Sequence, residues 1–207
     1  MGEGVDKLSK LPRAFVVMGH PAEYDHPYSQ KVLQILQETV DRIFDQGIPV
    51  RVTSRGPVFD TILQVARRKH RESLLQTVLF RWNGDREWNH EERYLANNYP
   101  NNTILVHDDT TQQILETYDA RGYIVLPGTL GTFNRLFDLW TVIQTGKIRR
   151  KPIGFVGRAF AEPILKIFKS TLETHKPPLI SSGDIEIVQI ADTVDEEMAI
   201  LGLPRPS

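Results

Sequence analysis

Short apolar runs rich in β-branched residues alternate with longer amphipathic segments along most of this chain. The short runs are AFVVMG (14–19), PVRVTS (49–54), TVLFRW (77–82), TILVHD (103–108), YIVLPG (123–128), PIGFVG (152–157) and IEIVQI (185–190). Such an alternation is typical of βαβ units, in which each crossover helix returns the chain to a parallel sheet. The sequence therefore predicts a three-layer α/β/α fold of the Rossmann-like type, with a mostly parallel sheet of about seven strands.

The segment YSQKVLQILQETVDRIFDQG (28–47) has the helical pattern most clearly. Its apolar residues recur every three or four positions, and Gly47 can end the helix by taking the left-handed backbone conformation. Further helices are expected over 59–71, from Thr110, after Gly131 and after Phe160. The run TVLFRW has an alternative interpretation, because it could extend the helix before it.

Length and composition favour a single domain over residues 1–207, with residues 1–12 flexible. The chain is 40% hydrophobic and has a formal charge of −1, which is too balanced for a broad contact with nucleic acid or an anionic membrane. It has no cysteine, so disulfides, thiolate metal ligands and cysteine nucleophiles are excluded. Because no signal peptide and no run of about 18 apolar residues appears, we expect a soluble, cytoplasmic protein.

The segment NGDREWNHEERYLANNYPNN (Asn83 to Asn102) is polar, rich in turn residues and longer than an ordinary connection. It is interpreted as a long loop. Long loops in compact domains are often binding loops or lids, and a mobile surface loop is about as frequent. Whether this segment closes over a ligand stays open.

Ligands of open parallel sheets bind beyond the carboxyl ends of the strands, where the strand order reverses. The first predicted strand is followed by Gly19 and His20, the second by Thr53 to Gly56, and the run YIVL by PGTLGT. Glycines there let a ligand approach the backbone, and Thr132 can cap a helix whose free N–H groups attract an anion. We therefore expect a phosphate site formed by Gly19, His20, Gly56, Gly128, Thr129, Leu130, Gly131 and Thr132. A tight turn without a ligand explains the same glycines about equally well.

The sequence LPGTLGTFNRLFDLWTVIQTGKIRRKPIGFVG, followed by LISSGDIEIVQIADTVDEEM, resembles the C-terminal half of the LONELY GUY proteins, long labelled lysine decarboxylases. That family has the pattern PGGxGTxxE, then a helix, a QTGKI-like segment and a Pro-Ile/Val strand. The resemblance is strongest from about Asp119 to Leu201, and upstream it rests mainly on strand order and on Gly19 and Gly56. It implies a Rossmann-like homodimer that hydrolyses the N-glycosidic bond of nucleoside 5′-monophosphates, such as cytokinin riboside monophosphates.

The catalytic positions of that family are changed in this sequence. Its phosphate loop corresponds to Pro127 to Thr132, with Thr129 in place of the second glycine. Its glutamate falls on Arg135, and its Arg-Lys pair falls on Gln112 and Gln113. A carboxylate would stabilise the positive charge that builds on the ribose as the base leaves, by analogy with glycoside hydrolysis, whereas Arg135 opposes it. We therefore expect a nucleotide binder in which the family reaction is slow or silent and Arg135 adds phosphate affinity.

Other titratable residues are weaker candidates. Arg135, Asp138 and Gln112 are weak candidates for catalysis, and Asp138 more simply pairs with Arg135 or is solvated. Asp108 and Asp109 are interpreted as helix caps. The segment HPAEYDHPY (20–28) matches no metal signature, and no lysine is marked as a pyridoxal phosphate partner. We therefore expect no metal and no cofactor.

Two hypotheses about the function remain. One is a divergent nucleoside monophosphate phosphoribohydrolase, and the other is a carrier or sensor without catalysis, as molybdenum-cofactor carriers of this fold type show. A homodimer is expected in either case, because the helix FNRLFDLWTVIQ is apolar over a wide arc that includes Trp140. One side of that helix would face the sheet and the other a second copy.

Overall fold

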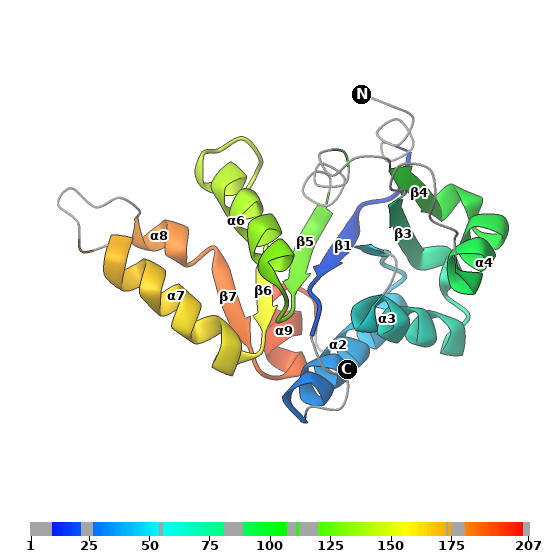
Figure 1. Cartoon of the computed structure of the whole chain (residues 1–207), viewed down its shortest axis with the longest axis horizontal. Helices are drawn as coiled ribbons and strands as arrows, with labels where there is room; N and C mark the ends of the chain where they lie inside the picture. Colours follow the sequence, from blue (N-terminus) through cyan, green and yellow to red (C-terminus); the bar gives the residue numbers. More distant parts are fainter. Residues whose placement is uncertain are drawn as a thin grey trace.

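A seven-stranded sheet with helices on both faces forms the molecule (Figure 1). The computed structural model describes residues 10–21, 27–53, 56–80, 89–106, 111, 120–172, 174 and 181–204. The strands are β1 (Ala14–Met18), β2 (Val50–Thr53), β3 (Leu75–Phe80), β4 (Thr103–Val106), β5 (Ala120–Val125), β6 (Ile153–Val156) and β7 (Val188–Ala191). Their order is β4-β3-β2-β1-β5-β6-β7, and every pairing is parallel. The predicted Rossmann-like α/β fold is confirmed, and the run TVLFRW contributes to a strand.

The helices form two layers. One face of the sheet carries α2 (Pro27–Asp45), α3 (Pro57–Arg68), α4 (His90–Asn98) and α9 (Val194–Ile200); the other carries α6 (Leu130–Gln144), α7 (Arg158–Leu172) and α8 (Ser182–Ile185). Short 3₁₀ turns at Glu72–Leu74 and Pro100–Asn102 lead into β3 and β4. The helix predicted from Thr110 falls almost entirely outside the described residues.

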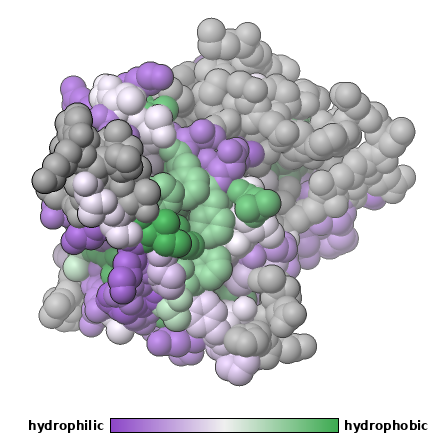
Figure 2. All heavy atoms as spheres, turned by 60° about the vertical axis from the view of Figure 1, so that its left-hand side comes forward, coloured by the Kyte–Doolittle hydropathy of each residue, from purple (hydrophilic) through white to green (hydrophobic). Residues whose placement is uncertain are grey.

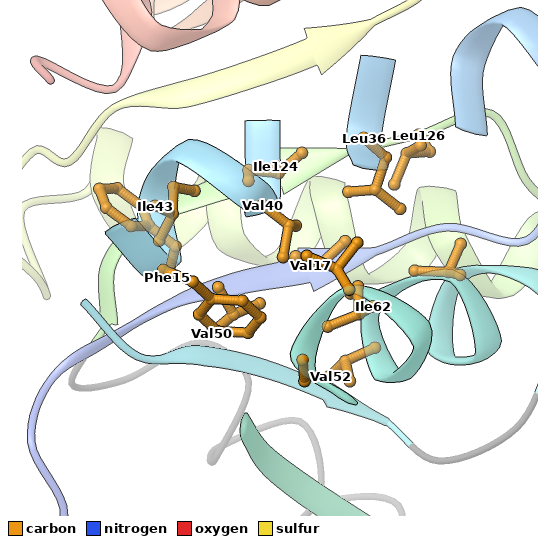
Figure 3. Close-up of a cluster of buried hydrophobic side chains, with 14 of the residues drawn as sticks. Phe15, Val17, Leu36, Val40, Ile43, Val50, Val52, Ile62, Ile124 and Leu126 are labelled. Carbon is orange, nitrogen blue, oxygen red and sulfur yellow. The ribbon is translucent and has the colours of Figure 1, made fainter. Parts of the chain in front are cut away.

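Strand β1 divides the hydrophobic core into two parts. Phe15 and Val17 face the layer of α2 and α3, whereas Val16 and Met18 face the layer of α6. Figure 3 shows how Leu36, Val40 and Ile43 of α2 pack over Phe15 and Val17. This alternation follows from the period of two in a strand, and it explains why the run AFVVMG is apolar at every position: both faces of the strand are buried.

The polar segment 83–102 contains a helix and is not a loop throughout. Helix α4 begins after a capping box, in which the Asn89 side chain accepts from the Glu92 amide and the Glu92 carboxylate accepts from the Asn89 amide, both at 2.8 Å. Leu95 is 1% exposed and fixes the helix to the core. The prediction of a long loop was wrong because one buried leucine gives too weak an apolar pattern to reveal a helix.

Two further differences lie near the C-terminus. The run IEIVQI begins in α8 and a turn, so β7 starts only at Val188. Helix α9 was not predicted, although Thr193 and Glu196 form a second capping box at its start. The signal was present in the sequence, in the spacing of a threonine and a glutamate three residues later.

The wide apolar arc of α6 is covered within the chain. Trp140 and Leu139 contact the sheet side of the core, while Phe133 stacks on Phe160 and Phe137 lies against Phe168 of α7, with ring centroids 5.6 and 5.1 Å apart. A second copy is therefore not needed to explain this arc. Figure 2 shows that apolar residues also gather in a band on the side that carries α7 in Figure 1, where Ile167 is 63% exposed.

Within the described residues, no helix is long and apolar enough to cross a membrane.

The capping box of α4 gives a first prediction. Asn89→Ala removes the side-chain acceptor of the Glu92 amide and should lower the free energy of unfolding by about 1 kcal/mol. Asn97→Ala, at an exposed position of the same helix, should change it by less than about 0.5 kcal/mol. Urea denaturation followed by circular dichroism measures both, and equal stabilities of the two variants would show that the box does not hold α4.

Candidate functional site

The strand order reverses between β1 and β5, and there the chain segments after these two strands are joined by backbone hydrogen bonds. The Leu126 amide donates to the Met18 carbonyl at 2.9 Å, and the His20 amide donates to the Pro127 carbonyl at 3.0 Å. Gly19 has φ +145°, and a Cβ on it would lie 2.7 Å from the Leu126 Cβ. A glycine is thus required for the two segments to run this close together.

Helix α6 begins directly after this junction. Thr129 is its N-cap, and its carbonyl accepts from the Thr132 and Phe133 amides at 3.0 and 3.3 Å. The amides of Leu130 and Gly131 precede these first bonds of the helix. The Thr129 side chain makes no capping hydrogen bond, which leaves this helix start suited to an anion. Thr132, predicted as a possible cap, is instead the third residue of the helix and is 7% exposed.

The two glycines of the PGTLGT turn have different steric environments. A Cβ on Gly128 would lie 2.1 Å from Thr132 Oγ1 and 2.8 Å from the His20 amide nitrogen, so the fold itself requires glycine there. Among the described residues, a Cβ on Gly131 would meet nothing closer than Thr129 Oγ1 at 3.6 Å, which is ordinary contact. Packing therefore does not explain the glycine at position 131.

A hollow of about 260 Å³ opens at the junction of β1 and β5. It is lined by Val17, Met18, Gly19, His20, Val52, Thr53, Val58, Thr129, Gly131, Thr132 and Arg135. Five of the eight predicted phosphate-site residues are in this set. Of the others, Gly56 has φ +84° and lies against the ring of His20, Gly128 packs on Thr132, and Leu130 is 86% exposed.

The apolar wall of the hollow was missed by the sequence prediction. Val17 and Val52 are each the last residue but one of a strand, and Val58 lies in the first turn of α3. In sequence these valines look like any other core residues. Only the position of Thr53, directly after its apolar run, suggested that this wall reaches the carboxyl edge of the sheet.

The polar side of the hollow has cationic and neutral groups. Within the described residues its lining contains the guanidinium of Arg135, the exposed imidazole of His20 and two threonine hydroxyls near the start of α6, but no carboxylate. Asp138 is half-buried one helical turn beyond Arg135 and does not line the hollow. The hollow so described is suited to binding an anion and offers no carboxylate for a developing cation.

Gln112 and Gln113, the positions of the family's Arg-Lys pair, lie outside the described residues. So do Asp108 and Asp109, which were interpreted as helix caps, and His26 of the HPAEYDHPY segment. In the part of the chain that the structure describes, no three His, Cys, Asp or Glu side chains are grouped so as to hold a metal ion.

The family model described as possible lysine decarboxylase matches residues 85–201. The chain therefore belongs to this family, which includes the LONELY GUY proteins. The matched segment contains the turn and helix that form one side of the hollow. None of the curated proteins matches this chain.

Two solved structures have the same fold over nearly their whole length. The molybdenum cofactor carrier protein of Chlamydomonas reinhardtii is 14% identical, with a TM-score of 0.60 over 93% of this chain and 97% of that one. The protein TM1055, a structural genomics target, is 15% identical, with a TM-score of 0.57 over 92% of this chain and 98% of that one. At these identities the likeness establishes the fold.

The two glycines of the turn give a second prediction. Gly128→Ala forces a Cβ into Thr132 and the His20 amide, so we expect it to lower the free energy of unfolding by roughly 1–3 kcal/mol, as overpacking does. Gly131→Ala should leave stability unchanged or raise it slightly, because alanine favours a helix. Thermal unfolding of both variants measures the difference. If Gly131→Ala were destabilised as much as Gly128→Ala, packing would explain both glycines.

Proposed function

We propose that this protein binds a nucleoside 5′-monophosphate or a related phosphorylated ligand, with the phosphate at the start of α6. The observation that carries the proposal is Gly131. It lines the hollow, its amide lies in the first turn of α6, and the protein itself leaves room for a Cβ there. A phosphate that contacts this amide needs that room, which gives the glycine a reason that packing does not supply.

The rest of the hollow fits the two ends of a nucleotide. Thr132 and Arg135 follow Gly131 along the same face of α6 and lie beside the expected phosphate. The opposite wall is formed by Val17, Val52 and Val58, whose apolar side chains suit a base or another flat organic group. A volume of about 260 Å³ is close to the lower end of the range for small-molecule sites.

The lining argues against an efficient N-glycosidase. Hydrolysis of the glycosidic bond requires stabilisation of positive charge on the ribose, and Arg135 stands where the family has its glutamate. No carboxylate lines the described part of the hollow. We therefore propose binding with little or no hydrolysis. An active phosphoribohydrolase with other catalytic residues is the alternative enzyme function.

A carrier function is the second candidate. It is supported by the similarity in fold to a protein named for carrying the molybdenum cofactor, since a carrier must hold its ligand without cleaving it. The two candidates share the phosphate site and differ in the organic part of the ligand. A homodimer also stays a prediction, with the apolar band near α7 as the surface to examine.

Binding and hydrolysis are measured together in one experiment. Purified protein is titrated with AMP, GMP, CMP and UMP by calorimetry, and free base is followed by chromatography. At least one nucleotide should bind, and the base should not exceed the amount released in the absence of protein. Gly131→Ala should weaken binding about tenfold or more, which corresponds to about 1.4 kcal/mol, and Arg135→Glu should weaken it further by charge repulsion.

Gly183→Ala is the matched control, because a Cβ on Gly183 would meet only Ser181 Oγ at 3.8 Å, in ordinary contact. It should bind as the natural protein does. Unchanged affinity in both Gly131→Ala and Arg135→Glu would contradict the proposed phosphate position. Release of base by the natural protein would establish the enzyme function instead.

A further inference from the structure

Helix α9 carries a carboxyl group that is fully enclosed by the protein. Glu197 is 0% exposed, and neither of its side-chain oxygens has a hydrogen-bond partner in the described structure. The carboxyl lies on the backbone of β6, because a Cβ on Gly154 would be 2.2 Å from each of its two oxygens. A buried ionised carboxylate without a partner is costly, so this site favours the protonated acid.

Among the described residues, no charged group is paired with Glu197. Strands β6 and β7, which pack against α9, contain no titratable side chain. Arg42 of α2 pairs at the surface with Asp195, with its Nη1 2.6 Å from Asp195 Oδ1. The phenol of Tyr28, also on α2, donates to the Gly157 carbonyl.

The remaining carboxylate of α9 is also engaged elsewhere. Glu196 accepts from the Asp192 and Thr193 amides at the start of the helix. Burial raises the pKa of the Glu197 carboxyl to about 8.

The same helix contributes apolar contacts to the core. Val194, Met198 and Leu201 join the cluster that α2 forms over the sheet. Helix α9 has only seven residues, from Val194 to Ile200, so its position depends on this packing and not on its own helical stability. The carboxyl of Glu197 lies within this interface, so its charge state directly affects how stably α9 packs on α2 and the sheet.

We propose that α9 is a pH-sensitive latch, which stays packed on β6 and α2 while Glu197 is protonated and opens when that carboxyl ionises. The open state exposes the apolar face of α2 and of β6 that α9 covers.

The direction of the pH dependence follows from the two states. In the open state Glu197 is solvated and ionises near the ordinary pKa of 4.5, whereas in the closed state its pKa is raised to about 8. Between pH 4.5 and about pH 8, the closed state therefore binds one proton more than the open state. Its stability is greatest below pH 4.5, falls as the pH rises, and levels off above pH 8. Across that window the equilibrium constant for opening rises about tenfold for each pH unit.

Hydrogen exchange tests the latch. The amides of Leu201 and Leu203 donate to the Glu197 and Met198 carbonyls, both at 2.9 Å, and report on α9. After correction for intrinsic exchange, their protection in the natural protein should fall about 70-fold between pH 5.5 and pH 7.5. In Glu197→Gln the protection of these backbone amides should be the same at both pH values, because the glutamine side chain does not titrate. Glu186→Gln, which removes an exposed carboxylate, should keep the slope of the natural protein.

Two comparisons separate the latch from global unfolding and from a folding defect. The Phe15 amide of β1, bonded to the Pro49 carbonyl at 3.0 Å, should be better protected than the α9 amides at every pH. Equal protection of β1 and α9 would overturn local opening. Carbon-13 titration of the Glu197 carboxyl in the natural protein needs no variant, and a midpoint near the ordinary value in the folded protein would overturn the proposal.

Discussion

The close pairing of β1 with β5 is the constraint on which the rest of the structure depends. Chain connections extend from β1 to β4 on one side, and β5 returns to the other side of β1. The segments after both strands are bonded to each other through Met18 and Leu126 and through His20 and Pro127. This contact requires Gly19, fixes the start of α6, and opens the hollow between the two halves of the sheet.

At this junction, two glycines of the same turn have different roles. Gly128 is needed because Thr132 and the His20 backbone lie against it, whereas Gly131 has free space in front of it. Arg135 lies one turn further along α6 and gives the hollow a cation at the position to which the family resemblance assigns a glutamate. In the function proposed above, the site keeps the phosphate-binding part of a family enzyme and changes the part that would act on the glycosidic bond. Glu197 is a second residue whose type does not fit its surroundings, because its carboxyl is buried against β6 among apolar side chains.

The fold was largely predictable because seven buried strands leave continuous apolar runs, and because the 28–47 segment repeats at helical spacing. Helices α4 and α9 were missed since each is short and is fixed by a capping box and one to three buried side chains. For the site, the glycines and His20 were predictable from their positions after strands. Val17, Val52 and Val58 were not, because a valine that lines a hollow has the same sequence pattern as one in the core. The burial of Glu197 was also hidden, since its neighbours Asp195 and Glu196 are exposed and the run resembles a solvated helix face.

The most direct measurement of the central claim is a crystal structure of the protein with bound AMP, or with whichever nucleotide binds best. Phosphate oxygens should lie within about 2.7–3.2 Å of the Leu130 and Gly131 amide nitrogens, with the guanidinium of Arg135 beside them and the glycosidic bond intact. A nucleotide whose phosphate lies away from the start of α6 would contradict it.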